Sequence, residues 1–250
     1  MPGFGRIYLP DERDRDFLMR RMLPDARQLT LPVRKTWRIA ATALDQGETG
    51  TCVGHAWRNF LRCAPIRTEQ GGPSAFDIYR AAVGLDVWAD NDDEAALPDA
   101  DPGLDFGTSV RAGAEAITAV GRLKSYVWEF ELQPAVEWVL TQGPVVLGTN
   151  WYSSFRPDSE GIVRILPNAT VAGGHAYLWR GVDTRRALAR CSNSWGDEWG
   201  ISGDFFLPFR DLERLIHEEG EVCAAVEKRL APKATAPPAT RAFVPSGVRG

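Results

Sequence analysis

The chain reads Asp45-Gln46-Gly47-Glu48-Thr49-Gly50-Thr51-Cys52 directly before a segment whose apolar residues recur at intervals of three and four. This periodicity over residues 52–64 predicts an amphipathic helix. The glycine-rich turn therefore delivers Cys52 to a helix N-terminus, with Thr51 as the expected N-cap. The partial positive charge and unpaired N–H groups at such a terminus stabilise a thiolate, which is the reactive form of cysteine.

Gln46 stands six residues before Cys52 in this turn. A cysteine at a helix start is often only structural, so the upstream amide is what favours a catalytic site. A side-chain amide turned back toward the sulfur, together with the backbone N–H of Cys52, would supply two donors for a developing oxyanion. The turn therefore predicts a nucleophile with its oxyanion-binding groups.

The segment Gly173-Gly174-His175-Ala176-Tyr177 carries one of the three histidines of the chain. His175 opens a predicted strand, and the glycines before it let other backbone approach closely. A histidine at a strand start can also be a hydrogen-bonded structural residue. Among the three histidines, His175 is the best candidate for the base that Cys52 requires.

A third segment reads Ser192-Asn193-Ser194-Trp195-Gly196-Asp197-Glu198-Trp199-Gly200. Asn193 is placed to accept the imidazole N–H of His175 and so fix its tautomer. Trp195 is placed to shield that hydrogen bond from water, which strengthens it at lower dielectric. The alternative interpretation is a turn with two core tryptophans, but two Trp-Gly pairs four residues apart are unusual for such a turn.

Together, the Q-x5-C turn, the G-H-A strand start and the N-S-W-G-x-x-W-G run resemble the papain-type (C1) cysteine peptidases, in that family's order and over about residues 40–215. The Cys-His-Asn set is the known triad of that family. The resemblance implies a cysteine endopeptidase with no cofactor and no metal. It implies these catalytic residues: Cys52, His175, Asn193 and Gln46. It also implies that the substrate contacts Trp195, Gly107 and Gly174.

Helical patterns precede strand patterns, which predicts an α+β fold. The expected helices cover 52–64, 74–83, 108–120, 132–141 and 209–217, and the expected strands cover 145–149, 161–166, 176–182, 187–191 and 205–207. The resemblance adds a mainly helical half, carrying the cysteine helix, packed on an antiparallel β-barrel-like half with the site in the cleft between. The expected organisation is an N-terminal strap or short pro-segment (1–36), a peptidase domain (37–230) and a disordered Pro/Ala-rich tail (231–250), with an exposed loop over 86–105.

Composition excludes several other classes of protein. The 250 residues carry a net charge of −4 with both signs interspersed, which argues against nucleic-acid binding. No apolar run is long enough to cross a bilayer, and the N-terminus lacks the apolar stretch of a secretory signal. We therefore expect a cytoplasmic protein, with non-classical export or packaging as alternatives, whose partner is a peptide or protein substrate. The oligomeric state is left open.

Two positions depart from the family pattern, because Thr49 and Val53 stand where relatives carry a cysteine and a tryptophan. Losing the loop disulfide fits a reducing compartment, and Cys63, Cys191 and Cys223 are expected to be buried free thiols. Three rival hypotheses remain: a deamidase or transpeptidase with the same triad, a non-enzymatic binding protein on a peptidase fold, and an enzyme that processes only its own termini.

Overall fold

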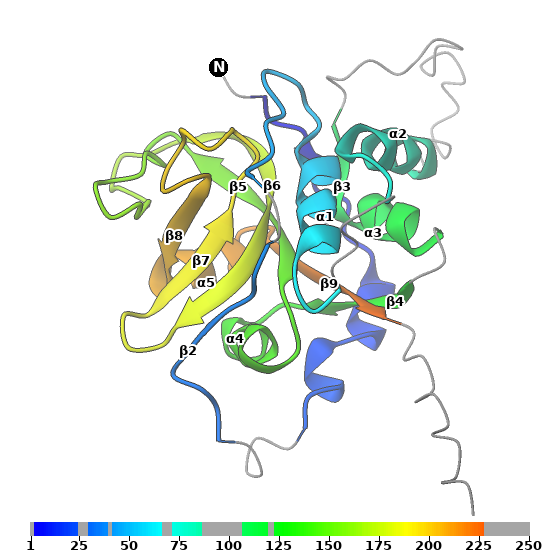
Figure 1. The fold of residues 1–250 in the computed structure, drawn as a ribbon, viewed down its shortest axis with the longest axis horizontal. Helices are drawn as coiled ribbons and strands as arrows, with labels where there is room; N and C mark the ends of the chain where they lie inside the picture. Colours follow the sequence, from blue (N-terminus) through cyan, green and yellow to red (C-terminus); the bar gives the residue numbers. More distant parts are fainter. Residues whose placement is uncertain are drawn as a thin grey trace, which may run out of the picture.

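The computed structural model describes residues 3–24, 30–39, 42–66, 72–86, 107–119 and 123–227. Its helical part and its sheet part meet along α1, which lies between them (Figure 1). Residues 87–105 of the expected loop and the expected tail over 231–250 lie outside the described residues. Within the described part, no helix is long and apolar enough to cross a membrane.

The helical part consists of α1 (Cys52–Arg62), α2 (Ala75–Leu85) and α3 (Val110–Ala119). Nearly every residue of α1 is buried, because α2 and α3 pack on one side of it and strands β5 and β6 on the other. The start of α2 is fixed by a capping box, in which Ser74 and Asp77 each accept the other's backbone N–H.

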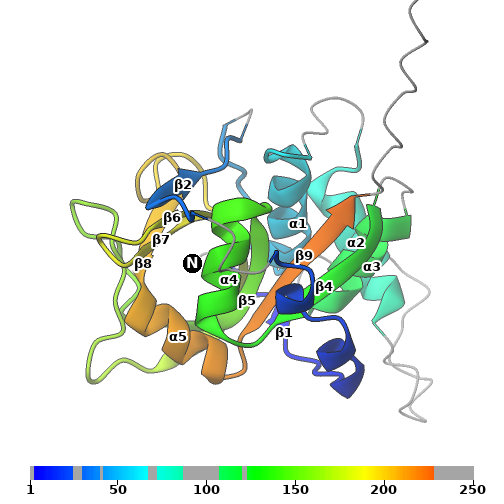
Figure 2. The same cartoon turned by 90° about the horizontal axis from the view of Figure 1, so that it is seen from below.

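The sheet part is a seven-stranded antiparallel sheet in the order β4-β9-β5-β6-β7-β8, with β2 paired to β6. Its strands are β2 (Arg34–Thr36), β4 (Leu123–Glu129), β5 (Val145–Tyr152), β6 (Val171–Asp183), β7 (Leu188–Ser192), β8 (Asp204–Pro208) and β9 (Glu221–Glu227). Two helices, α4 (Leu132–Thr141) and α5 (Phe209–His217), lie along the sheet (Figure 2). This arrangement confirms the α+β prediction.

One predicted strand is wrong, and five of the strands observed in the described residues were not predicted, of which β4 and β9 are the longest. Residues 108–109, expected at the start of a helix, form a short strand instead. Residues 161–166 form a loop with a single bridge from Ile162 to Phe206, because the Asp158 and Asp211 carboxylates accept backbone N–H groups that a strand would use for pairing. Strands β4 and β9 escaped prediction since their sequences mix charged and small residues without a clear alternation.

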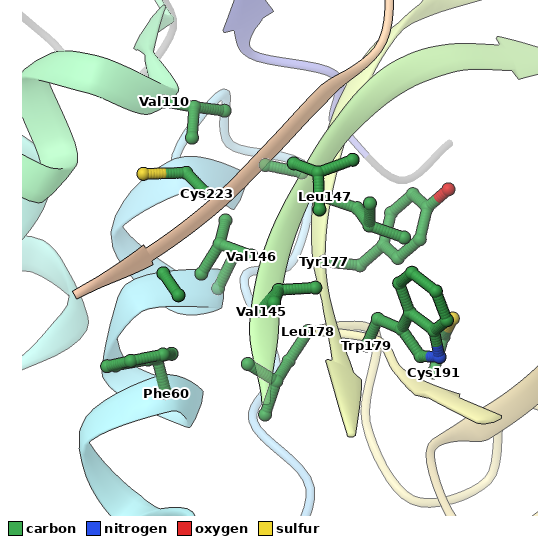
Figure 3. Packing of buried hydrophobic residues seen from close by; sticks show 14 of the residues in the cluster. Phe60, Val110, Val145, Val146, Leu147, Tyr177, Leu178, Trp179, Cys191 and Cys223 are labelled. Carbon is green, nitrogen blue, oxygen red and sulfur yellow. The ribbon is translucent and has the colours of Figure 1, made fainter. Parts of the chain in front are cut away.

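The core continues across both faces of the central strands. Figure 3 shows Phe60 of α1 and Val146 of β5 on one side of the sheet, and Tyr177, Trp179 and Cys191 on the other; all five are buried. Because helix α1 packs directly on β5 and β6, its first residue is held against the strand that carries the predicted base.

The approach of α1 to α2 depends on Gly54, where an added Cβ would lie 2.2 Å from the carbonyl oxygen of Ala75. We expect Gly54→Ala to lower the free energy of unfolding by about 1–3 kcal/mol, because backbone must shift to admit the methyl group. The matched control is Gly84→Ala in α2, where no atom lies within 4 Å; it should raise stability by about 0.5–1 kcal/mol. Thermal denaturation of both variants checks this, and equal melting temperatures would contradict the packing argument.

Candidate active site

Cys52 is the first residue of α1 and is fully buried. Backbone N–H groups of Ala176, Gly5 and Val53 lie near its sulfur and lower the pKa of the thiol, which opposes the effect of burial. Val53 belongs to the helix N-terminus, as the sequence predicts, and Ala176 follows His175 on β6. Thr51 occupies the N-cap position, but its hydroxyl does not cap the helix; it contacts Thr49 and the ring of His55 instead.

His175 lies on β6 and is also fully buried. Its Nε2 is 2.8 Å from Oδ1 of Asn193, which directly follows β7. The same oxygen accepts the backbone N–H of Ser194 at 2.9 Å, so the amide orientation is fixed and Nε2 must be the protonated ring nitrogen. The unprotonated Nδ1 is therefore left with its lone pair, and no hydrogen-bond partner in the described structure satisfies it.

Two tryptophans enclose the His175 ring. Trp195 stacks on it, with ring centroids 4.7 Å apart and an interplanar angle of 28°. Trp151 of β5 packs edge-on against it at 4.9 Å. Sequence reasoning anticipated Trp195 but missed Trp151, whose place in a strand interior gave no motif. The rings exclude water from the His175–Asn193 hydrogen bond, which strengthens it.

Gln46 is held in one orientation by three hydrogen bonds. Its Oε1 accepts the hydroxyl of Ser194 at 2.6 Å, and its Nε2 donates to the carbonyl oxygens of Thr49, at 2.7 Å, and Gly3, at 3.1 Å. The Gln46 amide thus donates to the carbonyl of Gly3, in the N-terminal segment of the same chain. This is the kind of contact that an oxyanion donor must make.

That segment is residues 3–7, here called the closing segment. Its strand β1 (Arg6–Ile7) pairs in parallel with β3 (Thr108–Ser109), and the Thr108 N–H donates to the carbonyl of Gly5 at 2.8 Å. Phe4 lies edge-on to both His175 and Trp195. The closing segment therefore runs as an extended peptide across the groups that the sequence predicts to be catalytic.

Gly107 and Gly174 lie on either side of this peptide. A Cβ at Gly107, whose φ is +76°, would lie 2.6 Å from the Gly5 carbonyl oxygen, and a Cβ at Gly174 would lie 2.3 Å from that of Arg6. Both positions must be glycine for the peptide backbone to come this close. The structure thus brings together all seven predicted site residues, and each of the two glycines contacts the closing segment.

Burial sets the protonation of the two reactive groups. It raises the pKa of the Cys52 thiol to about 11, although backbone hydrogen bonds oppose the shift. It lowers the pKa of His175 to about 4, with the hydrogen bond to Asn193 opposing. At neutral pH the thiol therefore keeps its proton and the imidazole is uncharged, because a charged pair is costly where no water can solvate it.

The other two histidines and the other three cysteines lie elsewhere in the fold. His55 is buried in α1, where its ring packs edge-on against Phe76, and His217 ends α5 beside Glu131. The other three cysteines are buried and form no disulfide, as expected. Within the described part of the chain, no group of three or more His, Cys, Asp or Glu residues is arranged to hold a metal ion.

The closing segment continues into a firmly anchored stretch. Met19 is fully buried, Asp14 pairs with Arg111 of α3, and Arg20 pairs with Glu129 of β4. A cavity of about 400 Å³ opens beside this anchor, and none of the four predicted catalytic residues lines it. A smaller cavity, of about 90 Å³, is lined in part by Asn193.

Solved structures to which the chain is similar include several cysteine proteases. Xylellain from Xylella fastidiosa superimposes with a TM-score of 0.69, at 18% identity, over 91% of this chain and 97% of that one. Procathepsin L2 of the Tenebrio molitor larval midgut gives 0.65, at 18% identity, over 90% and 78%. The ragweed pollen allergen Amb a 11 in its proform gives 0.53, at 12% identity, over 81% and 67%.

These likenesses establish the fold of the chain, which is the α+β fold of papain-like cysteine proteases. No protein-family model matches the sequence, and no curated protein matches it. The structural agreement extends over nine-tenths of this chain in the first two cases, so the fold assignment includes both the helical part and the sheet part.

Proposed function

We propose that this protein is a cysteine endopeptidase that hydrolyses peptide bonds through Cys52, with His175 as base, Asn193 orienting the base and Gln46 binding the oxyanion. The observation that carries the proposal is the closing segment itself. An extended peptide lies in the cleft with one carbonyl on Gln46 and a backbone group on the Cys52 sulfur. A site that binds this backbone is suited to bind a peptide substrate in the same place.

The reaction follows from these positions. His175 accepts the thiol proton, and the resulting thiolate attacks the substrate carbonyl carbon. The oxyanion is held by Gln46 and the backbone N–H of Cys52, and each such donor typically contributes about 2.7–4 kcal/mol to transition-state stabilisation. Collapse of this intermediate breaks the C–N bond as His175 protonates the leaving amine. Water, activated by His175, then releases the acid product and restores the thiol.

The closing segment must leave before this cycle can begin. With residues 3–7 in place, both reactive groups are buried and neutral. Their removal would admit water, which moves the pKa of Cys52 down and that of His175 up, toward a thiolate–imidazolium pair. We therefore infer that residues 1–36 act as a short inhibitory segment, anchored at 11–23 and closing the site at 3–7. Procathepsin L2 and Amb a 11 were likewise solved as proforms.

The test is to identify the products formed from a protein substrate after the closing segment is displaced. Mass spectrometry distinguishes the outcomes: hydrolysis cuts the backbone, deamidation of glutamine adds one dalton without a cut, and transpeptidation produces a cross-link. We expect backbone cuts, together with covalent labelling of Cys52 by a thiol-directed epoxide under reducing conditions. Deamidated or cross-linked products without cuts would reject the peptidase in favour of the corresponding rival.

Two further results would also decide against the proposal. Absence of both products and Cys52 labelling would favour a binding protein on a peptidase fold. Cuts confined to the protein's own termini, found by sequencing them after incubation, would favour an enzyme that processes only itself.

A further inference from the structure

A buried carboxylate lies beside Arg6 of the closing segment and is not one of the groups that perform the proposed reaction. Glu221 is the first residue of β9 and is 5% exposed. Its Oε2 is 2.7 Å from Nε of Arg6, and both side chains are almost entirely withdrawn from water. Burying an anion without a cation is costly, so the cation is what makes this carboxylate tolerable.

The pKa of Glu221 also reflects the free-energy cost of burying an ionised carboxylate. Burial raises it to about 7, even though the positive charge and hydrogen bond of Arg6 lower it. A cation at the Arg6 position therefore does much to keep this carboxyl group ionised.

The space around Glu221 is shaped for a guanidinium group. Arg6 donates from Nε to Glu221 and from Nη2 to the backbone carbonyl of Glu219, so two acceptors meet two edges of one planar group. Glu219 has φ of +66°, a conformation that non-glycine residues rarely adopt, and its carbonyl is one of the two acceptors. We call Glu221, the Glu219 carbonyl, Gly148 and Val110 the Glu221 pocket.

Gly148 makes room for this pair. It lies opposite Glu221 in the β5–β9 register. An added Cβ there would lie 3.0 Å from both Arg6 Nε and Glu221 Oε2, and 2.5 Å from Val110 Cγ2. Any larger residue at 148 would therefore intrude into the pocket.

The occupant of the pocket belongs to the closing segment. Arg6 follows Gly5, whose backbone contacts both the Cys52 sulfur and the Thr108 N–H. A side chain in the Glu221 pocket thus belongs to a residue adjacent to the one that touches the nucleophile. An extended substrate lying in the same cleft would place one side chain near its scissile bond into this pocket.

We propose that the Glu221 pocket selects an arginine side chain of the peptide substrate, and that Arg6 occupies it in the closed protein. This inference rests on the proposed peptidase function for its catalytic consequence. Two separate acceptors fit the forked guanidinium group better than the single ammonium of lysine. Peptides with arginine next to the scissile bond are the expected substrate class.

The experiment uses the full chain with Arg6→Gln, which vacates the pocket, and peptides carrying either arginine or its uncharged analogue citrulline at each position in turn. At one position near the cut, kcat/KM should favour arginine by about 10- to 100-fold, the range expected for hydrogen bonds to a charged group. Adding Glu221→Gln should bring that ratio close to one. The matched control, Glu213→Gln on the exposed face of α5, should leave it unchanged.

A second variant guards against misfolding of Glu221→Gln. Gly148→Ala in the Arg6→Gln background narrows the pocket while keeping the carboxylate, and it should also reduce the preference for arginine. Cleavage that persists with the same arginine-to-citrulline ratio in both variants would overturn the proposal.

A binding measurement on a variant without the nucleophile tests the pocket independently of the proposed peptidase function. In full-length Arg6→Gln carrying Cys52→Ala, calorimetry should show tighter binding of the arginine peptide than of its citrulline analogue, and Glu221→Gln should remove the difference. Equal binding of the two peptides overturns the pocket proposal. Selective binding without cleavage by any Cys52-containing variant supports the pocket and rejects the peptidase.

Discussion

Cys52→Ala is expected to lower kcat for peptide hydrolysis by about 10⁶-fold, the loss seen when a triad nucleophile is removed. The comparison is made in full-length protein whose closing segment has been displaced, so that the starting activity is measurable. The expected loss is large because no other described group can form the thioester. His175, whose Nδ1 has no hydrogen-bond partner, lies in the same buried site, but it cannot form a thioester because it carries no sulfur.

His175→Ala should cause a loss of similar size, and the double variant should lose little more, because the two residues act as one unit. Steady-state rates with a fluorogenic peptide measure all three. Cys63→Ala, which removes a buried thiol at the end of α1, is the control and should retain the parent activity. Independent, multiplying losses for Cys52 and His175 would mean that they do not cooperate in one step.

Gly5→Val is expected to raise the alkylation rate of Cys52 at pH 7.5 by about 10²- to 10³-fold. A Cβ at position 5 would lie 1.7 Å from the carbonyl oxygen of Gly50, so the closing segment cannot stay in place. Exposure would bring the thiol pKa from about 11 to about 8.5 or below, and the thiolate fraction at pH 7.5 rises by the corresponding factor.

The pH dependence distinguishes this mechanism from general loosening. In the parent protein, a raised thiol pKa means that the alkylation rate should keep increasing up to about pH 11. In Gly5→Val it should level off at a lower pH, since the thiolate is formed earlier. Iodoacetamide labelling followed by peptide mapping gives the rate at each cysteine.

The other cysteines provide the internal control for this measurement. Cys191 and Cys223 are fully buried in the core and should remain unlabelled unless the variant unfolds. Leu9→Ser, at an exposed residue just beyond the closing segment, should leave Cys52 as protected as in the parent. Unchanged labelling of Cys52 in Gly5→Val would show that residues 3–7 do not cover the site.

With the Glu221 pocket, the closing segment occupies a side-chain pocket as well as the backbone-binding groups that a substrate would use. The same cleft holds its backbone through Gln46 and Thr108 and its arginine through Glu221. A substrate and the closing segment would therefore compete for the same groups. If both proposals hold, peptides rich in arginine should also be the best at displacing the segment.

Short sequence motifs were enough to predict much of the candidate site. A tight glycine turn before a helical pattern defines where Cys52 must lie, and the helix forms from residue 52 as expected. The pairing of Asn193 with His175 was expected from their two motifs and from the resemblance to papain-type peptidases, and this hydrogen bond is present in the structure. The helix start depends on neighbours in sequence, and the His175–Asn193 pair was predictable because each residue stands in a recognisable motif.

The remaining features depend on residues far apart in the chain. Strand β9 lies between β4 and β5, and its place could not be inferred because a central strand beginning with Glu221 shows no regular alternation. Arg6 and Glu221 are separated by 215 positions, and neither stands in a motif. Only the folded chain brings them together at one edge of the cleft.

By itself, then, the sequence determined the α+β class, the cysteine helix and the identity of the groups around Cys52. The tertiary structure decided the state of those groups. Residues 3–7 cover Cys52 and His175 and exclude water, and the loss of solvation holds both groups neutral. The physical reason is that reactivity depends on hydration and long-range contacts, which a local pattern of residues does not encode.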